Sequence, residues 1–175
     1  AAARVAGQAL DLAAAELAQQ DGNRVHLQHG AVRETIELRP RAVEQTFTFA
    51  SLPQRGELLV AIDVDTALQG AADGTGLRFA GDGLDVRYSG AVAIDAGGHR
   101  IAAATTWIDG RVEIRVPESF VATAQLPLVI DPVIAGANVT AGTHDVGNPD
   151  VVFVPVTGEW IATYQEIFAA GDWDC

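Results

Sequence analysis

The alternation of hydrophobic and polar residues predicts a series of short β-strands, most clearly between residues 90 and 134. In Arg111–Val116, arginine and glutamate alternate with valine and isoleucine. This period of two is typical of a strand with one face in a core and one in water. The turn dipeptide Asp109-Gly110 favours a hairpin with the preceding strand, Arg100–Ile108. The apolar stretches Ala91–Asp95 and Leu126–Ile134 complete this predicted unit.

The same pattern predicts strands before this unit. They are Arg24–Gln28, Val32–Leu38, Val43–Phe49, Glu57–Val64, Leu77–Phe79 and Leu84–Tyr88. Residues 69–76 carry the turn dipeptide Asp73-Gly74 and are predicted to form a loop. In residues 1–20 the composition favours a helix, whereas the alternation at 10–12 and the turn at 21–23 favour a strand. Both readings stay open, and the strand is preferred.

These elements predict an all-β fold. About ten to twelve strands follow one another at spacings of roughly 8–12 residues, which is typical of sandwiches and related antiparallel architectures. The 18 glycines and seven prolines are spread along the chain, as many turns require. Apolar residues make up 49% of the chain, which argues against disorder. We therefore predict an antiparallel β-sandwich-like domain over residues 1–134.

After this domain the residue composition of the chain changes. Residues 135–148 are small, polar and turn-rich, and they are predicted to be a linker. Residues 149–175 contain two further strands, Asp150–Val156 and Trp160–Gln165, around the turn dipeptide Thr157-Gly158. A lone hairpin is marginally stable in water. This incomplete hairpin is therefore predicted to need the first domain or more chain, as the start of a repeat or propeller-like domain.

Charge and length of apolar runs exclude two classes of partner. The formal net charge is −12, and all 11 basic residues are arginine. No basic stripe is present to neutralise phosphates, so we expect no nucleic-acid binding. No apolar run approaches the roughly 20 residues that span a bilayer, so we expect no membrane insertion. The chain contains no methionine, which indicates a processed or excised piece.

Candidate chemistry is sparse. Asp172 and Asp174 are weak calcium candidates, because carboxylates with this spacing can supply two oxygen ligands on a loop. Solvated strand ends are the simpler explanation for such pairs, including Asp63 and Asp65. His26 and His29 lie three apart, which in a strand places them on opposite faces and makes poor zinc geometry. No cofactor is expected, with calcium as the possible exception.

Catalytic residues are not evident either. Two carboxylates could form a glycosidase pair, and Glu34 and Glu44 are candidates only in that weak sense. Exposed strand residues are the preferred reading of both. The single cysteine, Cys175, ends the chain and has no intrachain partner.

Several short motifs resemble an N-terminal module of large secreted bacterial proteins. The first lie at 23–25, 29–34 and 43–49, and the others at 86–90, 93–98 and 126–132, so the resemblance covers about residues 23–134. Such modules precede β-propeller-type or other extracellular repeats, and residues 148–166 look like the first blade of such a repeat. On this reading Asp172-Trp173-Asp174 ends an unfinished blade, and Cys175 has lost its disulfide partner.

The resemblance implies a secreted, structural or interaction module of a large extracellular bacterial protein, without intrinsic catalysis. It supplies no catalytic residues. The expected partner is the downstream part of the same polypeptide or another protein chain. The alternatives are an accessory domain of a secreted hydrolase and a calcium- or carbohydrate-binding module.

Overall fold

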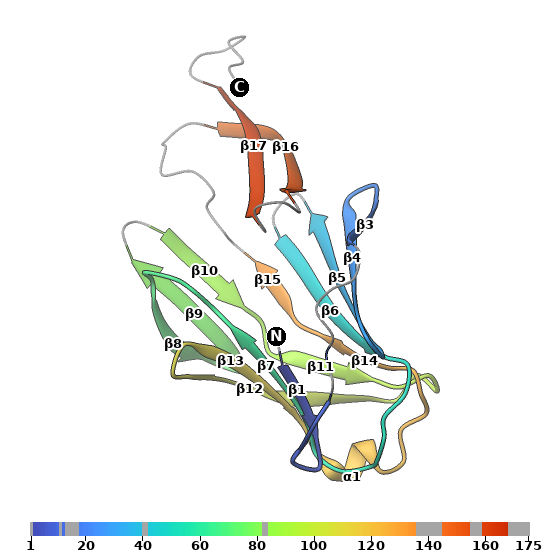
Figure 1. Cartoon of the computed structure of the whole chain (residues 1–175). Helices are drawn as coiled ribbons and strands as arrows, with labels where there is room; N and C mark the ends of the chain where they lie inside the picture. Colours follow the sequence, from blue (N-terminus) through green and yellow to red (C-terminus); the bar gives the residue numbers. More distant parts are fainter. Residues whose placement is uncertain are drawn as a thin grey trace. The chain divides into compact units, whose positions relative to one another are not determined.

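The structure is a computed structural model that describes residues 2–10, 12, 18–39, 42–81, 84–135, 145–154 and 159–167 (Figure 1). The chain divides into two compact units, Ala1–Ala137 and Asn138–Cys175. In the described part of the first unit, 15 strands form one large antiparallel sheet, and the only helix is the short α1, Glu118–Val121. The all-β class is therefore confirmed.

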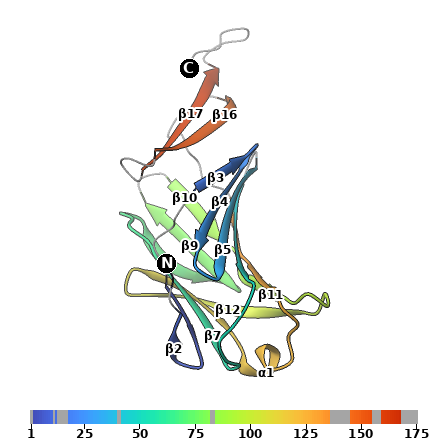
Figure 2. The same ribbon diagram turned by 45° about the vertical axis from the view of Figure 1, so that its right-hand side comes forward.

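The described strands of the first unit belong to one sheet, which branches at β6. Their bounds are β1 Ala2–Val5, β2 Gln8–Ala9, β3 Ala18–Asp21, β4 Arg24–His29, β5 Val32–Arg39, β6 Ala42–Phe49, β7 Leu58–Asp63, β8 Gln69–Asp73, β9 Gly76–Gly81, β10 Leu84–Tyr88, β11 Ala91–Ile94, β12 Arg100–Ile108, β13 Arg111–Val116, β14 Leu128–Asp131 and β15 Val133–Ala135. The sheet runs in the order β2-β1-β7-β13-β12-β11-β14-β6-β15-β10-β9-β8. Strands β5, β4 and β3 lie off this path, next to one another (Figure 2), and β5 joins them to β6.

Strand β6 is the branching point because it has three neighbours. Along one edge it pairs with β5 over its full length. Along the other edge its C-terminal half pairs with β14 and its N-terminal half with β15. Pro132 separates β14 from β15, because proline has no N–H to donate to the ladder. The single closing strand predicted at 126–134 is thus two short strands.

One predicted loop is wrong. Residues 69–73 form strand β8, which pairs with β9 through a turn at Gly74 and Thr75. Gly74 has a φ of +61°, which glycine adopts without steric cost. The small residues of β8 show little hydrophobic alternation because most of them are exposed at the end of the strand order. Backbone pairing with β9, rather than side-chain burial, therefore makes this segment a strand.

The N-terminal segment is extended in its described part, as preferred from the sequence. Strand β1 pairs with β7, and Ala3 and Val5 contribute to the core. Strand β3 pairs with β4 through the turn at Gly22 and Asn23. The alanine-rich helical propensity at residues 2–5 is overridden by this pairing with a neighbouring strand and by burial. Residues 13–17 lie outside the described residues.

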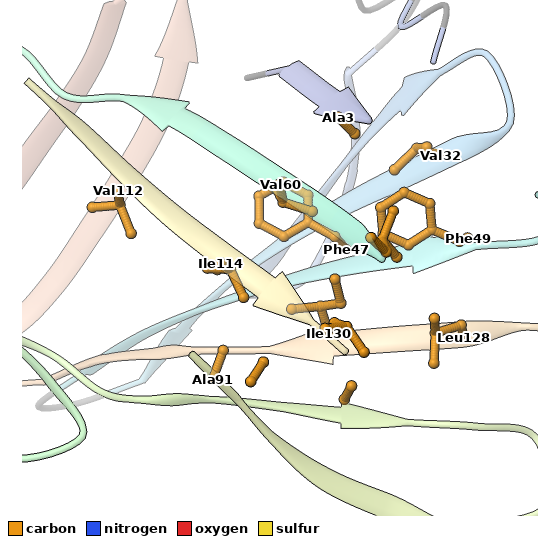
Figure 3. Packing of buried hydrophobic residues seen from close by; sticks show 14 of the residues in the cluster. Ala3, Val32, Phe47, Phe49, Val60, Ala91, Val112, Ile114, Leu128 and Ile130 are labelled. Atoms are coloured by element: carbon orange, nitrogen blue, oxygen red, sulfur yellow. The ribbon is translucent and has the colours of Figure 1, made fainter. Parts of the chain in front are cut away.

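The core fills the space between two parts of the bent sheet. Phe47 and Phe49 on β6, with Ile130 on β14, face Val60 on β7 and Ile114 on β13 (Figure 3). All five side chains are buried. They occupy alternate positions along their strands, which is why the period of two found the core residues of β13 correctly. This packing fixes the orientation of β5 and β6, whose opposite face is polar.

The second unit contains an antiparallel hairpin in its described residues. Strand β16 (Asp145–Val154) pairs with β17 (Glu159–Ile167), with a register shift between Gly147 and Asp150. The two strands predicted around residues 150–165 are confirmed. Strand β16 begins at Asp145, inside the predicted linker 135–148, and residues 136–144 lie outside the described part.

Candidate functional site

A row of polar side chains lies on one face of β4, β5 and β6. Antiparallel pairing places Glu37 opposite both Arg24 and Glu44, and Thr35 opposite both His26 and Thr46. Side chains directly opposite each other on neighbouring strands are close enough to interact. No local pattern in the sequence predicts this face, because its residues come from three strands and lie up to 22 positions apart.

Ion pairs and hydrogen bonds connect these side chains. Arg24 Nε donates to Glu37 Oε2 over 2.9 Å, and Arg39 forms ion pairs with Glu37 and Glu44. The hydrogen bond from Arg24 is the main reason why the pKa of Glu37 lies below its usual value. His26 Nδ1 lies 2.9 Å from Thr35 Oγ1. The face is therefore held in a defined arrangement by its own polar contacts.

Six of these residues line an open hollow with a volume of about 270 Å³. They are Arg24, His26, Thr35, Glu37, Glu44 and Thr46. The lining offers hydroxyl, imidazole, guanidinium and carboxylate groups and contains no phenylalanine, tyrosine or tryptophan. Most ligand pockets are predominantly apolar with a few polar groups. This hollow instead suits water or a small polar molecule.

Glu44, which lines the hollow, has a second carboxylate beside it, that of Asp131. Glu44 Oε2 and Asp131 Oδ1 are buried and accept no hydrogen bond, and Glu44 Oε2 is the oxygen that forms the ion pair with Arg39. Burial, and next the nearby Asp131 carboxylate, raise the pKa of Glu44 above its usual value. Asp131 is a residue that the sequence analysis did not single out, and the only signal was its place in the Ile130-Asp131-Pro132 motif.

The opposite face of the same strands carries a second polar network. The Tyr88 hydroxyl donates to Gln45 Oε1 over 3.3 Å, and Gln45 Nε2 donates to Glu34 Oε1 over 2.7 Å. His29 Nε2 lies 3.1 Å from Glu34 Oε2. Burial, with the Glu34 charge as a smaller cause, raises the pKa of Tyr88. Buried polar groups with satisfied hydrogen bonds make a fold more specific, and this network joins strands β4, β5, β6 and β10.

The reading of Glu34 and Glu44 as exposed strand residues is wrong. Glu34 is only 8% exposed, and Glu44 is partly buried. Glu34 is stabilised inside by Gln45 and His29, so its carboxylate keeps partners without contact with bulk water. The two residues also lie on opposite faces of the sheet, because Glu44 is opposite Glu37 and not opposite Glu34. Together they cannot flank one glycosidic bond.

The other candidates are dispersed. His26 and His29 lie on opposite faces of β4, as predicted, and Asp63 forms an ion pair with Arg111 at 2.6 Å. Within the described ranges, no group of three or more histidine, cysteine, aspartate or glutamate residues could hold a metal ion. Asp172, Asp174 and Cys175 lie outside these ranges. No helix in the described part is both long enough and apolar enough to cross a membrane.

Asp95 forms a compact anchor after β11. Its Oδ1 accepts the backbone N–H of His99 over 2.8 Å, and its Oδ2 accepts that of Gln125 over 3.0 Å. The bond from Gln125, followed by those from His99, lowers the pKa of Asp95 to about 2. The carboxylate thereby ties the turn between β11 and β12 to the segment before β14.

The variant Asp95→Asn is expected to lower the melting temperature at pH 7 by several degrees, because its amide has a single acceptor oxygen and one of the two backbone N–H groups would face its NH2 donor. The folded-state pKa of Asp95 lies below the unfolded value, so its stabilisation is complete above pH 4 and is lost between about pH 4 and 2. Thermal unfolding from pH 7 to pH 2 measures both effects. The exposed Asp65→Asn variant is the control, and equal behaviour of the two variants would contradict the anchoring role.

A comparison of the chain with models of protein families, with curated proteins and with solved structures found no match.

Proposed function

We propose that this chain is a secreted structural or interaction module of a large extracellular bacterial protein, without intrinsic catalysis. The observation that carries the proposal is the role of the residues in the resembling motifs. Asn23, Ser89 and Asp95 of these motifs stand at separate strand junctions, and each of the three holds two segments of backbone together. A module selected for its fold is expected to keep such anchors, whereas an enzyme is expected to bring reactive groups into one site.

Each of the three anchors is a side-chain to backbone hydrogen bond between segments distant in sequence. Asn23 Nδ2 donates to the carbonyl of Leu38 over 2.7 Å, and joins the β3–β4 turn to the end of β5. Ser89 Oγ accepts the backbone N–H of Val133 over 2.8 Å, and joins the end of β10 to β15. Asp95 joins the β11–β12 turn to the segment before β14. These contacts give Asn23, Ser89 and Asp95 a structural role in the fold.

Charged residues on the surface also form ion pairs between neighbouring strands of the sheet. Arg78 donates to Asp85 through Nε and Nη2, and the shortest of these contacts is 2.6 Å. Arg111 donates to Asp63 on β7 over 2.6 Å. Exposed ion pairs stabilise a fold only weakly because water screens them, so these pairs mainly favour the observed cross-strand register. Such use of arginine supports a structural role.

The fold supports the β-sandwich-like part of this proposal. The first half of β12 pairs with β11, and the second half pairs with β13. The sheet therefore bends at β12, and the core lies between the two parts, as in a sandwich. We assign the hairpin β16–β17 to the start of a repeat or propeller-like domain. A two-stranded hairpin is marginal alone, so its open edges suit strands from downstream in the same polypeptide or from another chain.

The test is the location and intact mass of the protein in its native source. An antibody against the purified chain is used on culture medium, intact cells and cytoplasmic fractions, with a cytoplasmic enzyme as the marker for lysis. We expect the chain outside the cell, as part of a polypeptide much larger than 175 residues. Detection in the cytoplasmic fraction alone would overturn the proposal. Hydrolase activity of the larger polypeptide would favour the alternative, an accessory domain of a secreted hydrolase.

A further inference from the structure

We propose that Glu44 on β6 and Asp131 at the end of β14 share one proton, and that this proton makes the junction between the two strands sensitive to pH. The inference concerns the fold of the first unit and does not depend on the proposed function.

The geometry of the junction brings the two carboxylates together. Strand β6 pairs with β14 at Phe47–Phe49 and with β15 at Ala42–Glu44, so Asp131 follows directly after the last pair with β14. Glu44 Oε2 and Asp131 Oδ1 are both buried and neither accepts a hydrogen bond, although the Arg39 guanidinium forms an ion pair with Glu44 Oε2. An ionised carboxylate only accepts hydrogen bonds. Two such groups can therefore bond to each other only when one of them carries a proton.

A proton fits this position better than water or a metal ion. The two oxygen atoms have almost no solvent-accessible surface, so bulk water does not reach them. A metal ion needs several ligands, and no suitable group of three or more metal-ligating side chains occurs among the described residues. A carboxyl hydrogen requires no additional space. It gives Asp131 Oδ1, which has no other partner, a hydrogen bond to the Glu44 carboxyl group.

The surrounding charges also favour one proton. Glu44 faces Glu37 and Arg39 on β5 and Asp131 on β14, while Arg24 and His26 on β4 line the same hollow. The two guanidinium groups of this cluster face three carboxylates, so the ionised carboxylates outnumber the guanidinium groups by one. Burial and the Asp131 charge raise the pKa of Glu44, in agreement with a proton at this position.

Because the pKa of Glu44 is raised, the fold is expected to lose stability as the pH rises. The folded-state pKa of Glu44 lies above its unfolded value, so the shared proton stabilises the fold at pH values below the unfolded pKa. This stabilisation is lost as the pH rises through the folded-state pKa. Above it, two buried anions oppose each other where β6 passes from β14 to β15. The dependence is opposite to that of Asp95.

The test uses two variants that replace the proton by an amide N–H. Glu44→Gln donates to Asp131, and Asp131→Asn donates to Glu44, so each keeps the hydrogen bond at every pH. The full chain is unfolded thermally between pH 4 and pH 9, and the side-chain carboxyl groups are followed by ¹³C NMR. Glu57→Gln is the matched control, because Glu57 is an exposed glutamate that also pairs with an arginine. His26→Gln removes the imidazole of the hollow.

We expect the Glu44 carboxyl to titrate at a higher pH than that of Glu57 in the wild-type chain. The melting temperature of the wild type should fall through that titration, and Glu57→Gln and His26→Gln should keep this fall. Either amide variant should abolish it and melt higher than the wild type at pH 8. A Glu44 titration at or below that of Glu57, or an unchanged fall in both amide variants, would overturn the proposal. If one amide variant fails to fold, the melting of the other variant and the titration of Glu44 in the wild-type chain still test the proposal.

Discussion

Replacement of Phe49 by alanine is expected to lower the free energy of unfolding of the first unit by about 3–5 kcal/mol. Phe49 is 0% exposed and lies opposite Val32 on β5 and Leu128 on β14, so its ring is held from both sides of β6. Alanine would remove the apolar surface that the ring buries and leave a cavity, because neighbours in a packed sheet relax only partly. The effect combines lost transfer free energy with lost packing contacts.

Chemical denaturation of the full chain, followed by near-UV circular dichroism, measures this loss. The melting temperature is expected to fall by about 2–4 °C for each kcal/mol. Ile108→Ala is the control, because Ile108 is 44% exposed and its truncation should cost little. A loss for Phe49→Ala no greater than that for Ile108→Ala would contradict the packing of the core against the inner face of β6.

Gly76→Ala is expected to destabilise the first unit by about 3 kcal/mol or more. A Cβ atom at Gly76 would lie 2.3 Å from the carbonyl oxygen of Tyr88 and 2.8 Å from the nitrogen of Gly90. These are backbone atoms, so no side-chain rotation relieves the clash. The variant must separate β9 from the segment between β10 and β11, and that segment also carries the Ser89 anchor to Val133.

Gly81→Ala supplies a matched control in the same strand. Its Cβ would lie 3.4 Å from the side chain of Leu68, which is ordinary contact, so a change close to zero is expected. Urea denaturation of both variants, with the wild type beside them, gives the comparison. A Gly76→Ala variant as stable as Gly81→Ala would contradict the close approach of the backbones at this point.

Hydrophobic alternation predicted the central hairpin residue for residue. The predicted strands Arg100–Ile108 and Arg111–Val116 coincide with β12 and β13. The reason is physical, because this hairpin is closed by the turn at Asp109 and Gly110 and its β13 strand buries every second side chain. Where backbone pairing alone stabilises a strand, as in β8, the sequence lacks this signal. That difference explains the wrong loop at residues 69–76.

The candidate site could not be predicted in the same way. Arg24, Glu37 and Glu44 are neighbours only because β4, β5 and β6 pair in one particular register. A shift of one residue would move every side chain to the other face. The sequence analysis named Glu44 as a carboxylate but paired it with Glu34, which the register places on the opposite face. Asp131 enters the site through the break at Pro132, which no periodicity reveals.

The sequence by itself determined that this chain forms short antiparallel strands, where most of them begin and end, and which face of β13 is buried. These properties depend on local alternation and on turn residues, and both can be read from neighbouring positions. Only the tertiary structure decided that β6 changes partner at Pro132, that Glu34 is buried with Gln45 and His29, and that Glu44 meets Asp131 beside a polar hollow. Those outcomes depend on contacts between strands distant in sequence, whose register is set by packing of the whole core.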